Sequence, residues 1–306
     1  MITDNHHVIS TEQFFSRPIL EKLFASAKAM KIAAPSQQLK GKILATVFYE
    51  PSTRTRFSFE AAMMRLGGDV ITTEAAAQFS SHSKGETLED SIKVISSYAD
   101  AIVLRHPEVG SAERAAKVSV VPVINAGDGQ GEHPTQALLD AFTINEELGH
   151  IDGLKIAMVG DLLNGRTIHS LLALLGLYHD IKVVLIAPDK LRLPESHKHS
   201  LGDKMSFSEA SSLEALDDSF DVVYVTRVQK ERFEDQDEYQ RLKDYFVVNQ
   251  SVMDRLGKQT VVMHPLPRVG EIDPLVDADP RAAYFRQAQN GLYVRMALLD
   301  HILGST

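Results

Sequence analysis

A run of hydroxyl and guanidinium side chains, Ser52-Thr53-Arg54-Thr55-Arg56, offers the clearest chemistry in the sequence. It follows an apolar run of strand length, Ile43–Phe48, and precedes apolar residues at helical spacing. Pro51 ends the strand, and Ser52 or Thr53 is a favourable N-cap for the helix. Backbone N–H groups, hydroxyls and the first arginine would then converge on one point, as in a phosphate site. An ordinary helix cap beside surface arginines explains the same residues without a ligand.

Further polar or cationic segments follow other predicted strands. They are Arg105-His106, His133 with Gln136, Asp161–Arg166, Arg227 and His264-Pro265-Leu266-Pro267. Taken alone, Arg105 could equally form a structural ion pair, and a lone histidine such as His133 is more often structural. Because parallel sheets bind ligands beyond the carboxyl ends of their strands, the whole set indicates a cleft lined by charged groups. In that setting, His133 could donate a hydrogen bond to a polarised carbonyl.

The elements that must position these residues alternate between strand and helix. Strands are predicted at 43–48, 69–72, 101–104, 120–125, 155–159, 182–187, 221–226 and 260–264. Helices are predicted at 11–34, 87–98, 112–118, 137–148, 167–177 and 287–303, with helical patches near 208–216 and 238–256 and a mobile loop over 75–85. This alternation predicts an α/β protein with two doubly wound parallel-sheet domains and the active site in the cleft between them. We expect one domain from 1–132 plus 287–306 and the other from 133–286.

Length and composition exclude several classes of protein. The 306 residues suffice for two domains. Cysteine is absent, which excludes disulfides, a thiolate nucleophile and cysteine metal sites. The formal net charge of −9 disfavours nucleic acid or an anionic membrane as the main partner. The N-terminus has no secretory or transit pattern and no apolar run is long enough to span a bilayer, so we expect a soluble cytoplasmic protein.

Cofactor and metal motifs are also missing. The segment Gly160–Gly165 lacks the G-x-G-x-x-G spacing of a dinucleotide site, and no phosphate-loop lysine pattern supports ATP. His197 and His199 have no third ligand at a suitable spacing, so a metal site there is disfavoured. The charge run over 229–235 is typical of a solvated face. We expect no cofactor and no metal.

The motifs resemble those of a known enzyme family. Ser52–Arg56, followed by Phe57-Ser58-Phe59-Glu60, resembles the carbamoyl-phosphate motif of the transcarbamoylases, as does His133-Pro134-Thr135-Gln136. Three later segments resemble the aspartate branch: Gly160–Thr167, Thr226–Arg232 and His264–Arg268. Ornithine enzymes would carry a cysteine in the last segment, and this chain has none. The resemblance covers essentially the whole chain.

The resemblance implies transfer of the carbamoyl group of carbamoyl phosphate to L-aspartate. The products would be N-carbamoyl-L-aspartate and phosphate, in the committed step of pyrimidine synthesis, with the first domain binding carbamoyl phosphate and the second aspartate. By motif position, the phosphate would be held by Ser52, Thr53, Arg54, Thr55 and Arg105, and the carbonyl would be polarised by Thr55, Arg105 and His133. Gln136 would hold the carbamoyl amide. Arg166 would bind the α-carboxylate of aspartate, and Arg227 and Gln229 would bind its side-chain carboxylate. The backbone carbonyls of Leu266 and Pro267 would orient the amine and the amide.

The family also shares its active sites between subunits of a homotrimer. Ser80 and Lys84 match the loop that reaches a neighbouring subunit, with Ser81 as a rival for Ser80. Whether regulatory chains or a dihydroorotase join the trimer is left open by the sequence.

The charges suit this chemistry. Carbamoyl phosphate carries about two negative charges and aspartate two carboxylates, which would repel strongly in a cleft of low dielectric. Five candidates supply positive charge: Arg54, Lys84, Arg105, Arg166 and Arg227. The substrate amine attacks directly, so catalysis would consist of orientation and charge stabilisation without a protein nucleophile. Another amine acceptor or a non-catalytic homologue are the rival interpretations; the latter is disfavoured because the expected catalytic residues are present.

Overall fold

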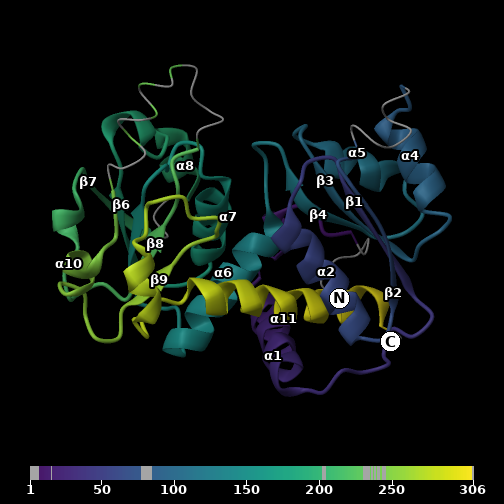
Figure 1. Cartoon of the computed structure of the whole chain (residues 1–306), viewed down its shortest axis with the longest axis horizontal. Coiled ribbons are helices and arrows are strands. Elements are labelled where there is room, and N and C mark those ends of the chain that lie inside the picture. The colour runs from purple at the N-terminus through teal and green to yellow at the C-terminus, as the bar shows by residue number, and fades with distance from the viewer. Residues whose placement is uncertain are drawn as a thin grey trace. The chain divides into compact units, whose positions relative to one another are not determined.

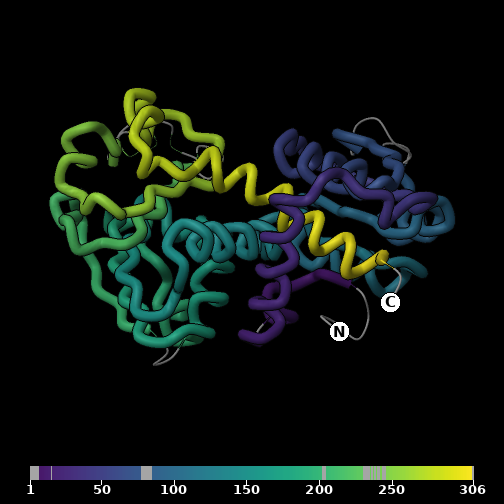
Figure 2. Tube along the Cα trace, turned by 90° about the horizontal axis from the view of Figure 1, so that it is seen from below, coloured from purple at the N-terminus to yellow at the C-terminus, as the bar shows by residue number. Residues whose placement is uncertain are grey.

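The computed structural model describes residues 7–14, 16–76, 85–201, 205–229, 235, 237, 239, 242 and 246–304. The chain divides into two compact units, one formed by residues 1–139 and 289–306 and the other by residues 140–288 (Figure 1). The divisions fall inside two helices, α6 (Pro134–Leu148) and α11 (Tyr284–Leu303). Figure 2 traces α11, in yellow, as one continuous helix. Each unit contains one parallel sheet, so the predicted pair of parallel α/β sheets is confirmed.

The first unit contains a four-stranded sheet with the order β2-β1-β3-β4. Its strands are β1 (Ile43–Phe48), β2 (Asp69–Glu74), β3 (Ala101–His106) and β4 (Val123–Asp128). After β2 the chain returns to the other side of β1 to form β3, so the strand order reverses between β1 and β3.

Helices cover both faces of this sheet. Ala45 and Val47 of β1 pack with Leu88 and Ile92 of α4 (Leu88–Ile95) and with residues of α5 (Ser111–Val118). Thr46 points the other way, because strand side chains alternate, and its hydroxyl donates to Glu60 of α2 (Thr53–Arg65) at 2.9 Å. The unit begins with the 3₁₀ turn η1 (Thr11–Phe14) and α1 (Arg17–Ile32).

The second unit contains a five-stranded sheet with the order β7-β6-β5-β8-β9. Its strands are β5 (Lys155–Val159), β6 (Ile181–Ile186), β7 (Met205–Ala210), β8 (Val222–Val225) and β9 (Val261–Met263). Its other elements are α7 (Arg166–Leu175), η3 (Asp189–Leu191), α8 (Glu195–Leu201), η5 (Leu213–Ala215), α10 (Gln250–Met253) and η7 (Pro274–Ala278). The strand order reverses between β5 and β8.

The core of this unit follows the same alternation. Val159 and Val225 pack on one face of the sheet with Phe246, Val252 and Val276. Tyr224, which points to the opposite face, hydrogen bonds to residue 140 of α6. Strands β5 and β8 are buried on both faces, which explains why their sequences are unbroken apolar runs.

Several predicted elements differ from the structure. The helical patch predicted at 208–216 is wrong, because 205–210 form the edge strand β7 and only the short turn η5 follows. Polar residues alternate along this exposed edge, which removes the apolar run that identifies a central strand. Within the described part of 238–256, Tyr239, Leu242 and α10 are α-helical, as predicted, whereas the predicted helix 11–34 is divided into η1 and α1.

Two further expectations concern the first unit. The strand predicted at 120–125 begins at Val123, after Pro122, and continues to Asp128, which pairs with His106 beyond an irregularity in the ladder. Most of the loop predicted over 75–85 falls at 77–84, outside the described residues. Among the residues that the structure covers, no helix is long and apolar enough to cross a membrane.

Candidate active site

Each sheet carries part of its predicted site residues where the strand order reverses. In the first unit, residues 52–55 follow β1, and Arg105 on β3 pairs directly with Phe48 of β1. In the second, Arg166 begins the helix after β5, and Arg227 follows β8, the neighbour of β5. Adjacent connections leave such a sheet on opposite faces at this point, and ligands bind there in open α/β sheets. The topology therefore brings residues that are distant in sequence to the carboxyl ends of neighbouring strands in each sheet.

The start of α2 presents groups that favour an anion. Ser52 is the N-cap, with φ −157°, and its side chain forms no capping hydrogen bond within the described chain. Thr53 and Arg54 are exposed, whereas Thr55 is buried. The first N–H groups of a helix have no partner within the helix and carry the positive end of its dipole. Hydroxyls, N–H groups and a guanidinium are thus gathered on one helical turn.

The second arginine of this motif has a different environment. Arg56 Nη2 lies 3.0 Å from Glu74 Oε2, and Nη1 donates to the hydroxyl of Thr72 at 3.4 Å. Thr72 also donates to Glu60, which lies one helical turn after Arg56. Arg56 therefore joins α2 to the edge strand β2, whereas Arg54 is exposed to solvent.

Arg105 lies between the ends of three strands. Its Nη1 donates to the carbonyl of Ala126 on β4 at 3.2 Å, and its Nη2 lies 3.5 Å from Glu50 Oε2, two residues after β1. The guanidinium is half-buried. These contacts hold one positive charge at the carboxyl ends of β1, β3 and β4.

His133 and Gln136 occupy the start of α6. The backbone carbonyl of His133 accepts hydrogen bonds from the N–H groups of Gln136 and Ala137 at 3.0 and 3.2 Å, so the helix begins directly after it. His133 is buried and Gln136 is half-buried. The preceding loop is anchored by Asp128, whose carboxylate accepts from the backbone of Glu132 and Gly110 at 2.9 and 2.8 Å. Ser80 and Lys84 fall outside the described residues.

In the second unit, a closed turn precedes Arg166. The buried carboxylate of Asp161 accepts from the backbone N–H of Asn164 at 2.9 Å and from its side-chain amide at 3.1 Å. The side-chain amide of Gln229 donates to the carbonyl of Asn164 at 2.8 Å. The structure therefore brings Gln229, from the segment after β8, onto the turn that positions Arg166.

The segment after β9 forms a tight turn around His264. The ring Nδ1 accepts from the backbone N–H of Leu266 at 2.8 Å, and Nε2 lies 2.7 Å from Glu271 Oε1. Leu266 has φ +52°, and its peptide bond to Pro267 is cis. Glu271 also accepts from the backbone N–H of Val269 at 2.9 Å, so one carboxylate fixes both the ring and the following chain.

Burial and hydrogen bonding determine the protonation states of His264 and Glu271. Burial lowers the pKa of His264 despite the opposing effect of Glu271, and the charges of Arg268 and Arg227 lower that pKa further. Burial alone would raise the pKa of Glu271, but the hydrogen bond from His264 and backbone hydrogen bonds keep it below its ordinary value. The pair is therefore a neutral imidazole donating from Nε2–H to an ionised carboxylate.

Comparison with known families identifies this arrangement. The pattern described as "Aspartate/ornithine carbamoyltransferase, carbamoyl-P binding domain" matches residues 6–146. That described as "Aspartate/ornithine carbamoyltransferase, Asp/Orn binding domain" matches residues 152–302. The chain belongs to the aspartate/ornithine carbamoyltransferase family. The resemblance inferred from the sequence motifs is thereby confirmed.

Individual carbamoyltransferases of this family are similar over almost the whole chain. The aspartate carbamoyltransferase catalytic subunit of Methanocaldococcus jannaschii is 51% identical, over 97% of this chain and 97% of its own. A crystal form of that subunit superposes with a TM-score of 0.91, covering 97% of this chain and 98% of its own. Aspartate carbamoyltransferase 3, chloroplastic, of Pisum sativum is 51% identical over 97% of this chain and 77% of its own. The Trypanosoma cruzi aspartate transcarbamoylase in complex with carbamoyl phosphate and aspartate is 41% identical, with a TM-score of 0.91 and coverage of 99% and 97%.

This carbamoyltransferase also has buried polar residues that motif reasoning missed. Arg295 on α11 is 3% exposed, donates to Ser58 on α2 at 3.0 Å and to Thr135 on α6 at 3.3 Å, and lies over the ring of Phe59. Asp140 on α6 is fully buried. In the sequence, the available sign of Arg295 and Asp140 is that each is a charged residue within an apolar helical stretch. This pattern does not reveal the residues that they contact.

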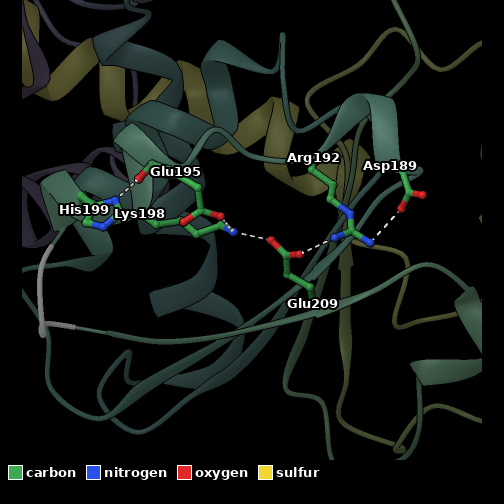
Figure 3. A network of polar contacts seen from close by, with 6 residues as sticks. All are labelled: Asp189, Arg192, Glu195, Lys198, His199 and Glu209. Atoms are coloured by element: carbon green, nitrogen blue, oxygen red, sulfur yellow. Dashed lines mark hydrogen bonds and ion pairs between the residues drawn. The ribbon is translucent and has the colours of Figure 1, made fainter.

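A charged network elsewhere in the second unit is structural. Lys198 lies 2.6 Å from Glu195 and also contacts Glu209 of β7, which is 2.9 Å from Arg192 (Figure 3). His199 bonds through Nδ1 to the carbonyl of Glu195. Within the described ranges, no three His, Cys, Asp or Glu side chains are grouped to hold a metal ion. These pairs, in which the side chains of Lys198 and Glu209 are 16% and 29% exposed, connect β7 to η3 and α8.

Proposed function

We propose that the chain catalyses transfer of the carbamoyl group from carbamoyl phosphate to the amine of L-aspartate, forming N-carbamoyl-L-aspartate and phosphate. One observation carries the proposal: residues 52–55 and Arg105 in the first sheet, and Arg166 and Arg227 in the second, follow or end the two strands between which the strand order reverses. The relatives named above are aspartate enzymes, and the last motif, His264-Pro265-Leu266-Pro267, has no cysteine. The reaction would be the committed step of pyrimidine synthesis.

The phosphate would bind at the start of α2. Ser52, Thr53 and Thr55 offer hydroxyls, and Arg54 offers an exposed guanidinium, beside the N–H groups of the first turn. Arginine and a helix N-terminus both favour a multiply charged oxyanion. This assignment makes the first unit the one that binds carbamoyl phosphate.

The carbonyl of the carbamoyl group would be polarised by Arg105, His133 and Thr55. Arg105 is held between Glu50 and Ala126, and His133 is buried at the start of α6, so both can be oriented before the substrate arrives. Donors fixed toward a developing oxyanion each contribute about 3 to 4 kcal/mol to transition-state stabilisation. Gln136, in the first turn of α6, would hold the carbamoyl amide.

Aspartate would bind to the second unit. Arg166 would take the α-carboxylate, and Arg227 with Gln229 the side-chain carboxylate, since guanidinium groups pair with carboxylates through two parallel hydrogen bonds. The carbonyls of Leu266 and Pro267, in the turn fixed by His264, would accept from the amine and the carbamoyl amide. That the two sets of residues share one cleft stays a prediction.

No protein nucleophile is needed for this reaction. The aspartate nitrogen forms a bond to the carbamoyl carbon, and charge develops on the carbonyl oxygen. The bond from carbon to the phosphate oxygen then breaks, and the proton lost by the amine passes to the departing phosphate. Catalysis consists of aligning the amine with the carbonyl and stabilising the oxyanion. This explains a site built from guanidinium, imidazole, hydroxyl and backbone groups.

Assembly and location belong to the same proposal. We infer a homotrimer in which Ser80 and Lys84 complete the site of a neighbouring subunit, as the family resemblance implies. The cytoplasmic location stays a prediction, and the pea relative is named chloroplastic. Regulatory chains or a dihydroorotase are open possibilities for the larger assembly.

Direct product formation tests the proposal. Purified protein with carbamoyl phosphate and L-aspartate should release phosphate and carbamoyl aspartate in equal amounts. A panel that replaces aspartate with ornithine and other amines identifies the acceptor. Turnover with ornithine and not with aspartate would overturn the proposed specificity, and no turnover with any amine would overturn the proposed reaction.

A further inference from the structure

A fully buried carboxylate in the second unit connects the segments assigned to aspartate. Asp140 on α6 accepts two hydrogen bonds, from the hydroxyl of Tyr224 to Oδ2 and from the amide of Gln287 to Oδ1, each at 2.7 Å. Both donors are themselves buried. Burying a carboxylate is costly unless its oxygens are hydrogen bonded, and here each oxygen accepts from a different element.

The Gln287 branch leads to the turn after β9. With its NH₂ group facing the carboxylate, Gln287 presents Oε1 to the backbone N–H of His264, which donates at 2.9 Å. His264 in turn accepts from Leu266, whose carbonyl is one of the predicted amine acceptors. A carboxylate can only accept, so Asp140 dictates which way the Gln287 amide faces and therefore what it offers to His264.

The Tyr224 branch leads to the two arginines. Tyr224 lies on β8, three residues before Arg227, and its ring sits on the face that α6 covers. Thr167, the residue after Arg166, faces Tyr224 closely enough for its side chain to lower the pKa of that hydroxyl, against the larger effect of burial. One hydroxyl thus connects the end of β8 to the first turn of α7.

We propose that Asp140 is a positioning residue for the amine acceptor, holding Arg166, Arg227 and the Leu266 turn in one arrangement. The inference rests on the proposed function. A residue that only stabilises the core could be replaced by an apolar group with little effect on substrate affinity. A residue that orients these three segments should instead govern the KM for aspartate, and leave the KM for carbamoyl phosphate unchanged.

The variants Asp140→Asn and Tyr224→Phe test this inference. Asn has nearly the same shape, but its NH₂ group can only donate, so it cannot accept from both Tyr224 and Gln287. Either it faces the Gln287 NH₂ group and that hydrogen bond is lost, or it faces the Tyr224 hydroxyl, which must turn its proton away from residue 140. Glu147→Gln is the matched control, because Glu147 also joins α6 to α11, through Arg286 at 2.8 Å, but lies outside this network. Steady-state kinetics with each substrate varied, together with thermal unfolding, are the measurements.

Asp140→Asn should raise the KM for aspartate about tenfold, because one buried hydrogen bond corresponds to about 1.4 kcal/mol, with the KM for carbamoyl phosphate within about twofold. Tyr224→Phe should raise the aspartate KM about threefold, and this variant answers the question if Asp140→Asn does not fold. Glu147→Gln should change neither constant. The effects of the first two variants should be less than additive in the double variant, since both act through one hydrogen bond.

If folded Asp140→Asn or Tyr224→Phe protein is less stable to heat but has an unchanged KM for aspartate, the network is structural. That result would overturn this inference and leave the proposed function intact. An equal rise in both KM values would overturn the inference as well. Wild-type protein that forms no carbamoyl aspartate would overturn the proposed function and the inference together.

Discussion

The imidazole of His264 accepts a hydrogen bond from the backbone N–H of Leu266 at 2.8 Å. Only an unprotonated Nδ1 can accept, and the other ring nitrogen is engaged with Glu271. The conformation of the Leu266–Pro267 turn is therefore coupled to the protonation state of one buried histidine.

This coupling predicts a loss of stability in mild acid. Burial lowers the pKa of His264 in the folded state, so the unfolded chain takes up the proton first. The contribution of His264 is complete above a pH of about 6.5 and is lost as the pH falls toward the folded-state pKa, at up to about 1.4 kcal/mol per pH unit. Urea unfolding between about pH 7.5 and about pH 5.5 measures it.

His264→Asn is the control for this effect. The Asn side-chain oxygen can take the place of Nδ1 as acceptor and does not titrate. The stability of the variant should therefore depend less steeply on pH than that of the wild type. Equal pH dependence in both proteins would contradict the assignment to His264.

Gly160 permits the close approach of β5 and β8. Its φ is +113°, and a Cβ built on it would lie 2.3 Å from the carbonyl oxygen of Thr226, one residue before Arg227. Gly153 has φ +79° but open space around that position. Gly160→Ala should therefore cost about 1 to 3 kcal/mol more than Gly153→Ala in urea unfolding, because it adds a clash to the shared backbone strain. Equal losses would show that the contact relaxes easily.

The buried side chain of Arg295 should stabilise the first unit. Arg295→Met keeps much of the side-chain volume but removes the hydrogen bonds to Ser58 and Thr135. We expect a loss of about 2 to 4 kcal/mol, since hydrogen bonds to charged groups contribute about 1.5 to 3 kcal/mol each. Arg286→Met, on the same helix in a partly exposed pair with Glu147, should cost about 1 kcal/mol or less. Similar losses in chemical denaturation would argue against a special role for Arg295.

Arg54 should be required for catalysis and not for folding. Arg54→Ala should reduce carbamoyl transfer by at least about a hundredfold, on the scale of lost transition-state donors, with an unchanged unfolding midpoint because the residue is exposed. Arg65→Ala, at the exposed C-terminal end of the same helix, is the matched control and should retain activity. Near-normal turnover by the Arg54→Ala variant would contradict the assignment of Arg54 to phosphate binding.

Sharing of sites between subunits can be tested by complementation. Arg54→Ala and Lys84→Ala chains should each be inactive alone. Mixed trimers should regain part of the wild-type activity, because some sites would draw an intact Arg54 and an intact Lys84 from different chains. Verified hybrids without recovered activity would indicate that each chain completes its own site.

The amino-acid sequence by itself determined the two parallel sheets and most of their central strands. A strand buried on both faces needs an unbroken apolar run, and Ile43–Phe48 and Lys155–Val159 were located to the residue. The motif order also determined the family. The edge strand β7 escaped detection because alternation with exposed polar residues is compatible with other structures.

Only the tertiary structure decided which charged residues serve the fold. Arg54 and Arg56 are two positions apart and alike in sequence, but Arg54 is exposed, whereas the Arg56 side chain is only 15% exposed beside Glu60 and Glu74. Asp140 and Gln287 are 147 positions apart, and their hydrogen bond exists because α6 and α11 meet in the folded unit. Sequence patterns report the local burial that helices and strands require, whereas partners across the core depend on packing between distant segments.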